Sequence, residues 1–146
     1  NNRVPAMADK SVAMVQALQE ELMNMPAVSI PTDHVLHGGM YARTIIVPPG
    51  IVMAGALIKV PTLLIVNGHA RVFIGEKSVD IIGYHVLAAS ALRKQALITI
   101  EETSFTLIFT TQAKTVEEAE DEFTDEAHLL FSRKECASNT VTITGE

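Results

Sequence analysis

The sequence lacks most of the features that tie a small protein to a membrane or to an oxidising compartment. Its single cysteine, Cys136, excludes a disulfide within the chain, so a reducing compartment such as the cytoplasm is permitted. No apolar run approaches the roughly 20 residues needed to span a bilayer. The first residues also lack the basic stretch and apolar core of a secretory signal. We therefore expect neither a membrane span nor a signal peptide.

Basic clusters are lacking as well. The chain has 11 lysines and arginines against 17 acids, and its formal net charge is −6. The acids of segment 117–126 account for this excess, so the remainder is close to neutral. No cluster of lysine or arginine is interleaved with aromatic residues, which argues against nucleic-acid binding through a basic face.

Apolar residues, in contrast, are abundant. They form 48% of the chain, and the mean hydropathy is +0.26, which is more apolar than a small monomer needs. At 146 residues the chain is expected to form one domain. We therefore predict that part of the apolar excess lies in contacts with another subunit or protein.

An N-terminal segment, residues 1–32, carries one amphipathic helix. Apolar residues recur at helical spacing between Asp9 and Met25, with glutamine and glutamate between them. Asp9 or Ser11 can cap the start, and Pro26 prevents continuation. The apolar stripe either docks onto another protein or folds onto the chain's own core. Its members, and the first set of candidate interaction residues, are Val12, Val15, Leu18 and Leu22.

Residues 33–112 show short apolar runs separated by turn residues, which is typical of an antiparallel barrel or sandwich. Pro48-Pro49-Gly50 forces a corner, and Asn67-Gly68 predicts a two-residue hairpin of type I′. The larger residues of Ser104–Thr110 alternate and should face the core. The predicted strands are Tyr41–Val47, Ile51–Val60, Leu63–Val66, His69–Ile74, Ser78–Ile82, Tyr84–Ala89, Leu97–Ile100 and Ser104–Thr110.

Residues 113–146 contain an acidic helix and a terminal strand. Thr115 and Glu118 form a capping box at the helix start. The helix then places Val116, Ala119, Phe123, Ala127 and Leu130 on one stripe. The run Thr140–Thr144 alternates as a strand does and needs an edge to pair with, either in its own sheet or in a neighbouring subunit. Its apolar members, Val141 and Ile143, complete the candidate interaction residues.

Four segments carry a family resemblance. In order they are Tyr41–Gly50 (YARTIIVPPG), Gly55–Lys59 (GALIK), Ile65–Gly68 (IVNG) and Gly83–His85 (GYH). Together they resemble the small cupin-like proteins encoded by tailed bacteriophages and prophages, over residues 33–126. The resemblance implies a mainly β, cupin-type jelly roll, also called a double-stranded β-helix, with the helices and terminal strand flanking it.

The metal ligands of the cupin motifs do not carry over. Where the family has paired histidines, this chain has Ala56 and Ile58, and where it has an acid, the chain has Thr62 or Leu63. The third histidine position falls on Lys94. Alkyl groups offer no lone pair to a transition metal, so we expect no bound metal or other cofactor and no catalytic residue.

Other chemistry has weak support. The alternative in which the protein is an enzyme uses a rebuilt metal site from His34, His37 and His85, with Glu101 or Glu102 later in the chain. A small-molecule or sugar-binding barrel is another, although only two tyrosines, five phenylalanines and no tryptophan are available for stacking. Gly38-Gly39 is a weak phosphate-loop signal because no strand, lysine and helix follow in order.

The sequence therefore predicts a non-catalytic barrel that self-assembles or docks to a partner. The phage resemblance makes a virion component the expected setting, in a head, neck or tail, with the partners being further copies of the chain or other virion proteins. The expected location is the virion or the cytoplasm of the bacterial host.

Overall fold

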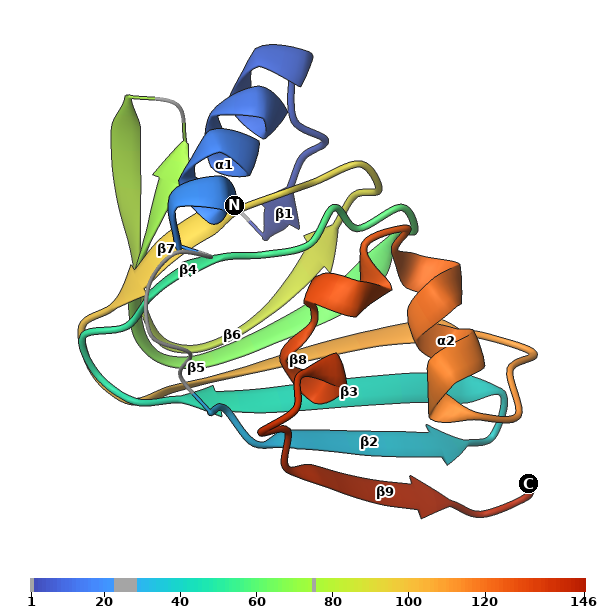
Figure 1. The fold of residues 1–146 in the computed structure, drawn as a ribbon. Helices are drawn as coiled ribbons and strands as arrows, with labels where there is room; N and C mark the ends of the chain where they lie inside the picture. The colour runs from blue at the N-terminus through green and yellow to red at the C-terminus, as the bar shows by residue number, and fades with distance from the viewer. Residues whose placement is uncertain (1, 23–28, 75) are drawn as a thin grey trace.

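The computed structural model describes residues 2–22, 29–74 and 76–146. Strands dominate, with a helix near each end of the chain (Figure 1). In chain order the elements are β1 (Arg3–Val4), α1 (Asp9–Leu22), β2 (Thr32–His37), β3 (Met40–Val47), β4 (Val52–Ala54), β5 (Thr62–Ile74), β6 (Lys77–Ala89), β7 (Ala96–Thr99), β8 (Thr103–Thr110), α2 (Val116–Phe123), the 3₁₀ turns η1 (Ala127–Leu129) and η2 (Phe131–Arg133), and β9 (Asn139–Ile143).

The six central strands pair in a nested order. β5 pairs with β6, β4 with β7, and β3 with β8, all antiparallel. This is one long hairpin rolled up on itself, and the pairing of β5 with both β7 and β8 closes the roll. Nested antiparallel pairing of this kind defines a jelly roll. The predicted mainly β, double-stranded β-helix fold is confirmed.

Strands from both ends of the chain extend the main sheet. Its order is β1-β6-β5-β8-β3-β2-β9. β1 pairs with β6 and β9 pairs with β2, each in parallel. The predicted strand at Thr140–Thr144 therefore exists, within Asn139–Ile143, and its partner is a strand of its own chain. β9 lies at one edge of the sheet, as far as the described residues go (Figure 1).

The sequence patterns missed β2. Residues 32–37 alternate strictly between buried and exposed, and β2 joins β3 through Gly38 and Gly39, whose φ angles are +58° and +71°. Positive φ at both turn residues is the requirement of a type I′ hairpin. Gly38-Gly39, which gave a weak phosphate-loop signal in the sequence, therefore forms a hairpin turn.

The hairpin expected at Asn67-Gly68 is wrong. β5 runs through this dipeptide without turning, and β6 runs through Gly83 opposite it. The hairpin connection lies instead between Ile74 and Lys77, which pair with each other. Gly68 has φ +147°, and a Cβ there would lie 2.5 Å from the Thr103 hydroxyl oxygen. Gly68 is needed because β8 approaches the backbone closely, not because the chain turns.

α1 begins at Asp9 as predicted and is described to Leu22; Pro26 lies outside the described residues. Val15 is buried, whereas Val12, Leu18 and Leu22 are half-buried. The helix contacts β4 and lies at the end of the molecule opposite β9 (Figure 1). Part of the apolar stripe therefore packs on the chain's own barrel.

The capping box at the start of α2 is confirmed, because the Thr115 hydroxyl accepts a hydrogen bond from the Glu118 backbone N–H at 3.2 Å. α2 ends at Phe123, and the chain continues through η1 and η2 rather than in one longer helix. The predicted stripe is nevertheless buried at every position: Val116, Ala119, Phe123, Ala127 and Leu130.

Candidate functional site: a filled barrel interior

The interior of the roll is occupied by apolar side chains from the sheet and from α2. Tyr41 and Phe123 are fully buried, and both contact Phe109, with ring centroids 5.7 Å and 6.0 Å away. Ala56, Ile58 and Val60 pack against this core cluster. The positions that correspond to the paired cupin histidines, Ala56 and Ile58, thus contribute hydrocarbon to a closed core.

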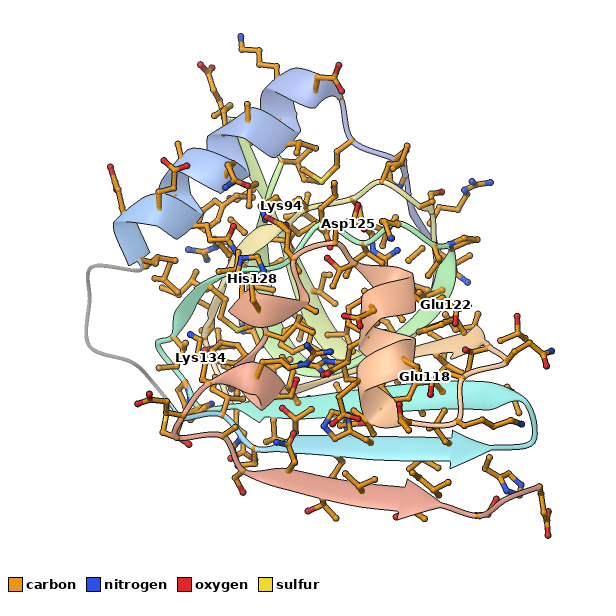
Figure 2. All side chains as sticks on the ribbon, turned by 45° about the vertical axis from the view of Figure 1, so that its right-hand side comes forward. Lys94, Glu118, Glu122, Asp125, His128 and Lys134 are labelled. Atoms are coloured by element: carbon orange, nitrogen blue, oxygen red, sulfur yellow. The ribbon has the colours of Figure 1, made fainter. Side chains whose placement is uncertain are left out.

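Lys94, which aligns in sequence with the third cupin histidine, is labelled in Figure 2 and forms an ion pair with Glu126. Its side chain is only 1% exposed, and its Nζ lies 2.7 Å from Oε1 of Glu126. That carboxylate oxygen also accepts the backbone N–H of Leu57 at 2.7 Å. Burial alone would raise the pKa of Glu126, but the hydrogen bonds from Lys94 and Leu57 outweigh it, and the net shift is downward. Lys94 and Glu126 therefore tie the C-terminal segment to the barrel.

The residues at the cupin ligand positions do not fit a metal ion. An ammonium group has donors only and no lone pair to offer. The Thr62 hydroxyl already accepts a hydrogen bond from Arg93 Nη2 at 2.7 Å, and Leu63 is 49% exposed. Within the described residues, no three His, Cys, Asp or Glu side chains are grouped so that they could hold a metal.

The alternative histidine set is dispersed over three different environments. His34 is buried on β2, and His37, three residues further on, hydrogen bonds Thr144 at 2.7 Å beside β9. His85 lies exposed on β6, where its Nε2 is 2.7 Å from the carbonyl oxygen of Ile82. His34 and His37 lie on a strand in which successive side chains alternate between faces, so they point to opposite sides of the sheet.

His34 has a structural role that its neighbours define. Its Nδ1 lies 2.6 Å from the Tyr41 hydroxyl and its Nε2 lies 2.6 Å from Oδ1 of Asn139. Burial raises the pKa of Tyr41 to about 12, so the phenol keeps its proton and donates to Nδ1. Nε2–H then donates to Asn139, which is the pattern of a neutral imidazole. Burial also lowers the pKa of His34. His34 thus links the start of β9 to the core.

A second buried ion pair joins the sheet to α2. Arg43 on β3 and Glu120 on α2 lie 2.8 Å apart, with side chains 7% and 2% exposed. Glu120 also accepts hydrogen bonds from Ser132 and from Arg133 Nε. Burial raises the pKa of Glu120, but the bonds from Ser132 and Arg133 and the charge of Arg43 outweigh it, so the net shift is downward. Through Glu120, the side chains of Arg43, Ser132 and Arg133 hold α2 against the sheet and the C-terminal segment. The sequence patterns did not predict these contacts.

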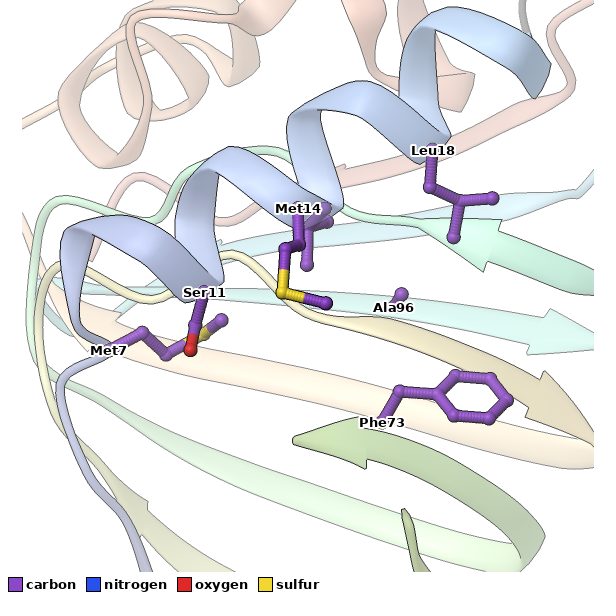
Figure 3. Close-up of a pocket in the computed structure, with 7 residues that line it drawn as sticks. Met7, Ser11, Met14, Leu18, Phe73 and Ala96 are labelled. Atoms are coloured by element: carbon purple, nitrogen blue, oxygen red, sulfur yellow. The ribbon is translucent and has the colours of Figure 1, made fainter. Parts of the chain in front are cut away.

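Hollows also occur on the surface, and two of them are candidates for binding. One, of about 170 Å³, lies between α1 and the β5–β7 region and is lined mainly by apolar residues (Figure 3). The other, of about 250 Å³, lies beside the β2–β3 turn and the C-terminal residues. Both are smaller than the roughly 300 Å³ at which pockets for small molecules usually begin. Neither contains Lys94, Arg43 or His34.

Exposed apolar side chains gather on the outer face of the main sheet. Leu63 of β5 pairs with Ile108 of β8, and Ala42 of β3 lies between Ile108 and Val35 of β2, so these residues form one cross-strand row. Several large members of this face are 38–64% exposed: Val35, Ile46, Leu63, Tyr84 and Val86. The candidate interaction residues Val141 and Ile143 on β9 are 50% and 51% exposed.

No helix in the described part of the chain is long and apolar enough to cross a membrane. No protein-family model matches the sequence, and no curated protein matches it either.

Several solved structures with a similar fold are described as cupins. A cupin superfamily protein from Desulfitobacterium hafniense has 14% identity, a TM-score of 0.46 and coverage of 77% of this chain and 97% of its own. An RmlC-like cupin with a double-stranded β-helix fold from Methanocaldococcus jannaschii has 12% identity, a TM-score of 0.45 and coverage of 60% and 85%. A cupin-2 domain from Rhodospirillum rubrum has 12% identity, a TM-score of 0.46 and coverage of 62% and 69%. The function of this chain has to be argued from its own residues.

Proposed function

We propose that this protein is a non-catalytic cupin-like barrel that works by assembling with further copies of itself or with a protein partner. The observation that carries the proposal is the filled interior. Where a cupin enzyme holds its ion and substrate, this chain has Ile58 in an apolar core and Lys94 bonded to Glu126. Apolar packing and this ion pair therefore occupy positions at which a cupin enzyme would present its metal ligands.

The outer surface supports the part of the proposal that concerns assembly. Large apolar residues are half exposed on the outer sheet face and on β9. Contiguous exposed apolar surface is characteristic of interaction sites. A setting inside a bacteriophage particle is a narrower proposal, supported by the four sequence segments that resemble phage-encoded cupins.

Light scattering coupled to size exclusion, over a micromolar concentration series, tests self-assembly. We expect a mass above that of one 15.8 kDa chain. A monomer at every concentration would exclude self-assembly, and the proposed assembly would then require a different protein as the partner. Mass spectrometry of purified virions from a host carrying the sequence tests the narrower setting, since a virion component must appear among the particle proteins.

A metal-dependent cupin enzyme and a small-molecule-binding barrel remain the competing functions. Elemental analysis of protein purified without chelators distinguishes the metal-dependent enzyme from the non-catalytic barrel. A stoichiometric iron, manganese, nickel or zinc ion would contradict the non-catalytic proposal, because it requires ligands that the interior does not offer.

A further inference from the structure

The edge strand β9 has features that specify a partner for it. β9 pairs on one side with β2 and is the last strand of the sheet. The Thr144 N–H donates to the Leu36 carbonyl and the Thr32 N–H donates to the Ser138 carbonyl, so even-numbered residues of β9 direct their backbone groups to β2. Alternation along a strand then directs the backbone groups of Val141 and Ile143 to the outside.

This outer edge carries none of the usual protection. Natural edge strands are blocked by lysine, proline, bulges or very short length. The run Thr140-Val141-Thr142-Ile143-Thr144 has no charge, proline or glycine, and β9 keeps its register with β2 along its full length. Each of its residues is exposed. Within the described part of the chain, nothing pairs with the outer side of β9.

The sequence of β9 is complementary to itself. If two copies meet antiparallel about a two-fold axis at Thr142, Val141 faces Ile143 of the second copy, and Thr140 faces Thr144 of the second copy. The outward backbone groups of Val141 and Ile143 then form the hydrogen-bonded pairs of an antiparallel ladder. Opposed β-branched and threonine pairs are favourable across strands, and Glu146 falls opposite Ser138 rather than opposite another acid.

We propose that β9 is the dimerisation edge of this protein and that its occupant is β9 of a second copy, which joins two seven-strand paths into one continuous sheet. A two-fold pairing of one edge with itself closes after two subunits. The inference rests on the proposed self-assembly and names its surface. Because a single strand edge is a small interface, the dimer should dissociate in the micromolar range rather than at nanomolar concentration.

Charge reversal at the two-fold axis tests this geometry. The Thr142 side chain is exposed and lies in register with Val35 of β2, so T142K and T142E should both fold. In each variant two like charges meet at the axis, and we expect the dissociation constant measured by sedimentation velocity to rise at least about tenfold, which corresponds to about 1.4 kcal/mol. An equimolar mixture of T142K and T142E should restore the dimer, because opposite charges then meet.

Two further variants keep the test decisive. V141P removes an outward N–H without touching the ladder to β2, and it should also yield monomer. I46K places a charge on the outer sheet face, on β3 and away from β9, and should leave the dimer intact. Circular dichroism and thermal unfolding report whether each variant folds.

The outcomes separate the two proposals. If the unmodified chain is a monomer at every concentration, both self-assembly and the β9 edge are overturned. If it is a dimer that I46K dissociates while T142K, T142E and V141P do not, the β9 edge is overturned and self-assembly stands. Dissociation by the β9 variants, with rescue in the mixture, supports the β9 edge.

Discussion

Lys94 and Glu126 form an ion pair with 2.7 Å between Nζ and Oε1, at the place where a cupin would carry its third histidine. Lys94 lies just before β7, and Glu126 lies in the segment that follows α2. The pair supplies both a fixed positive charge and its counter-charge within the fold. The pair therefore contributes to holding the C-terminal segment in place.

Replacing Lys94 with methionine should destabilise the protein by about 1–3 kcal/mol, because Glu126, whose side chain is 21% exposed, then loses its charged partner and is only partly compensated by water. Methionine keeps most of the side-chain volume, so packing changes little. The midpoint of urea unfolding measures the effect. The double variant K94M/E126Q should recover part of the loss, since a neutral amide still accepts the Leu57 N–H. A single variant as stable as the parent would show that the pair contributes nothing to folding.

Local patterns predicted much of the sheet correctly. β3 and β8 follow from apolar runs bounded by Pro48 and by polar turns, and the helix start at Thr115 follows from a capping box that involves only neighbours in sequence. β3 and β8 pair with strands distant in sequence, but the apolar runs and polar turns that delimit each strand are local. The sequence therefore contains most of the information that specifies them.

Non-local contacts decide what the patterns missed. β2 contains Thr32, Asp33 and His34, which do not read as an apolar strand; yet His34 is buried because Tyr41 and Asn139 satisfy both ring nitrogens. Asn67-Gly68 has turn chemistry, but β6 pairs along the whole of β5 and β8 pairs with β5 up to Asn67, so the strand continues through the dipeptide. Neither partner can be identified from the local sequence.

Charged core residues were missed for the same reason. Glu120 lies in a run of acids that reads as a solvated helix face, although it is almost fully buried against Arg43. The available signal was its helical spacing, four residues after Val116 and three before Phe123, which are both buried. Helical spacing alone did not reveal that an arginine on β3 would meet it.

Replacing Glu120 with glutamine should cost about 3 kcal/mol or more of unfolding free energy, because Arg43 then keeps a buried charge without its carboxylate. E117Q on the same helix is the matched control, since Glu117 is exposed and lies outside the Thr115–Glu118 capping box, so it should change stability by well under 1 kcal/mol. Chemical unfolding at neutral pH measures both variants. Equal effects from the two would contradict the assignment of Glu120 to the core.

Acid should act on the same carboxylate in a defined direction. The pKa of Glu120 is lower in the folded chain than its ordinary value of 4.5. Its contribution to stability is therefore present above pH 4.5 and is lost as pH falls through the lower folded pKa. Unfolding free energy measured from pH 6 downward should decline below about pH 4.5, and E120Q should show a shallower decline than the parent.

Gly68 and its cross-strand neighbour Gly83 allow steric clash to be separated from backbone strain. Both have positive φ, +147° and +86°, but a Cβ at Gly68 would lie 2.7 Å from Thr103 Cα, whereas a Cβ at Gly83 meets nothing within 4 Å. G83A should cost about 1–2 kcal/mol from backbone conformation alone. G68A should cost clearly more, about 3–4 kcal/mol, because β8 must also move. Thermal and urea unfolding of the two variants provide the comparison. Equal losses of unfolding free energy would show that β8 moves away from the added Cβ at no measurable cost.

Burial lowers the pKa of His34 below its ordinary value of 6.5, which predicts a loss of stability in mild acid. Below about pH 6.5 the unfolded chain takes up a proton on this ring, while the folded chain keeps it neutral between Tyr41 and Asn139. Unfolding free energy should therefore fall as pH decreases from 6.5 to the folded pKa and should level off beneath it. Urea unfolding between pH 8 and pH 5.5 measures the slope above the range where carboxylates titrate. H34Q should remove part of that slope, whereas H85Q, at an exposed histidine, should leave it unchanged. If H34Q keeps the full slope, the protonation that destabilises the protein occurs elsewhere, and His34 does not act as the acid-sensitive link between β2 and β9.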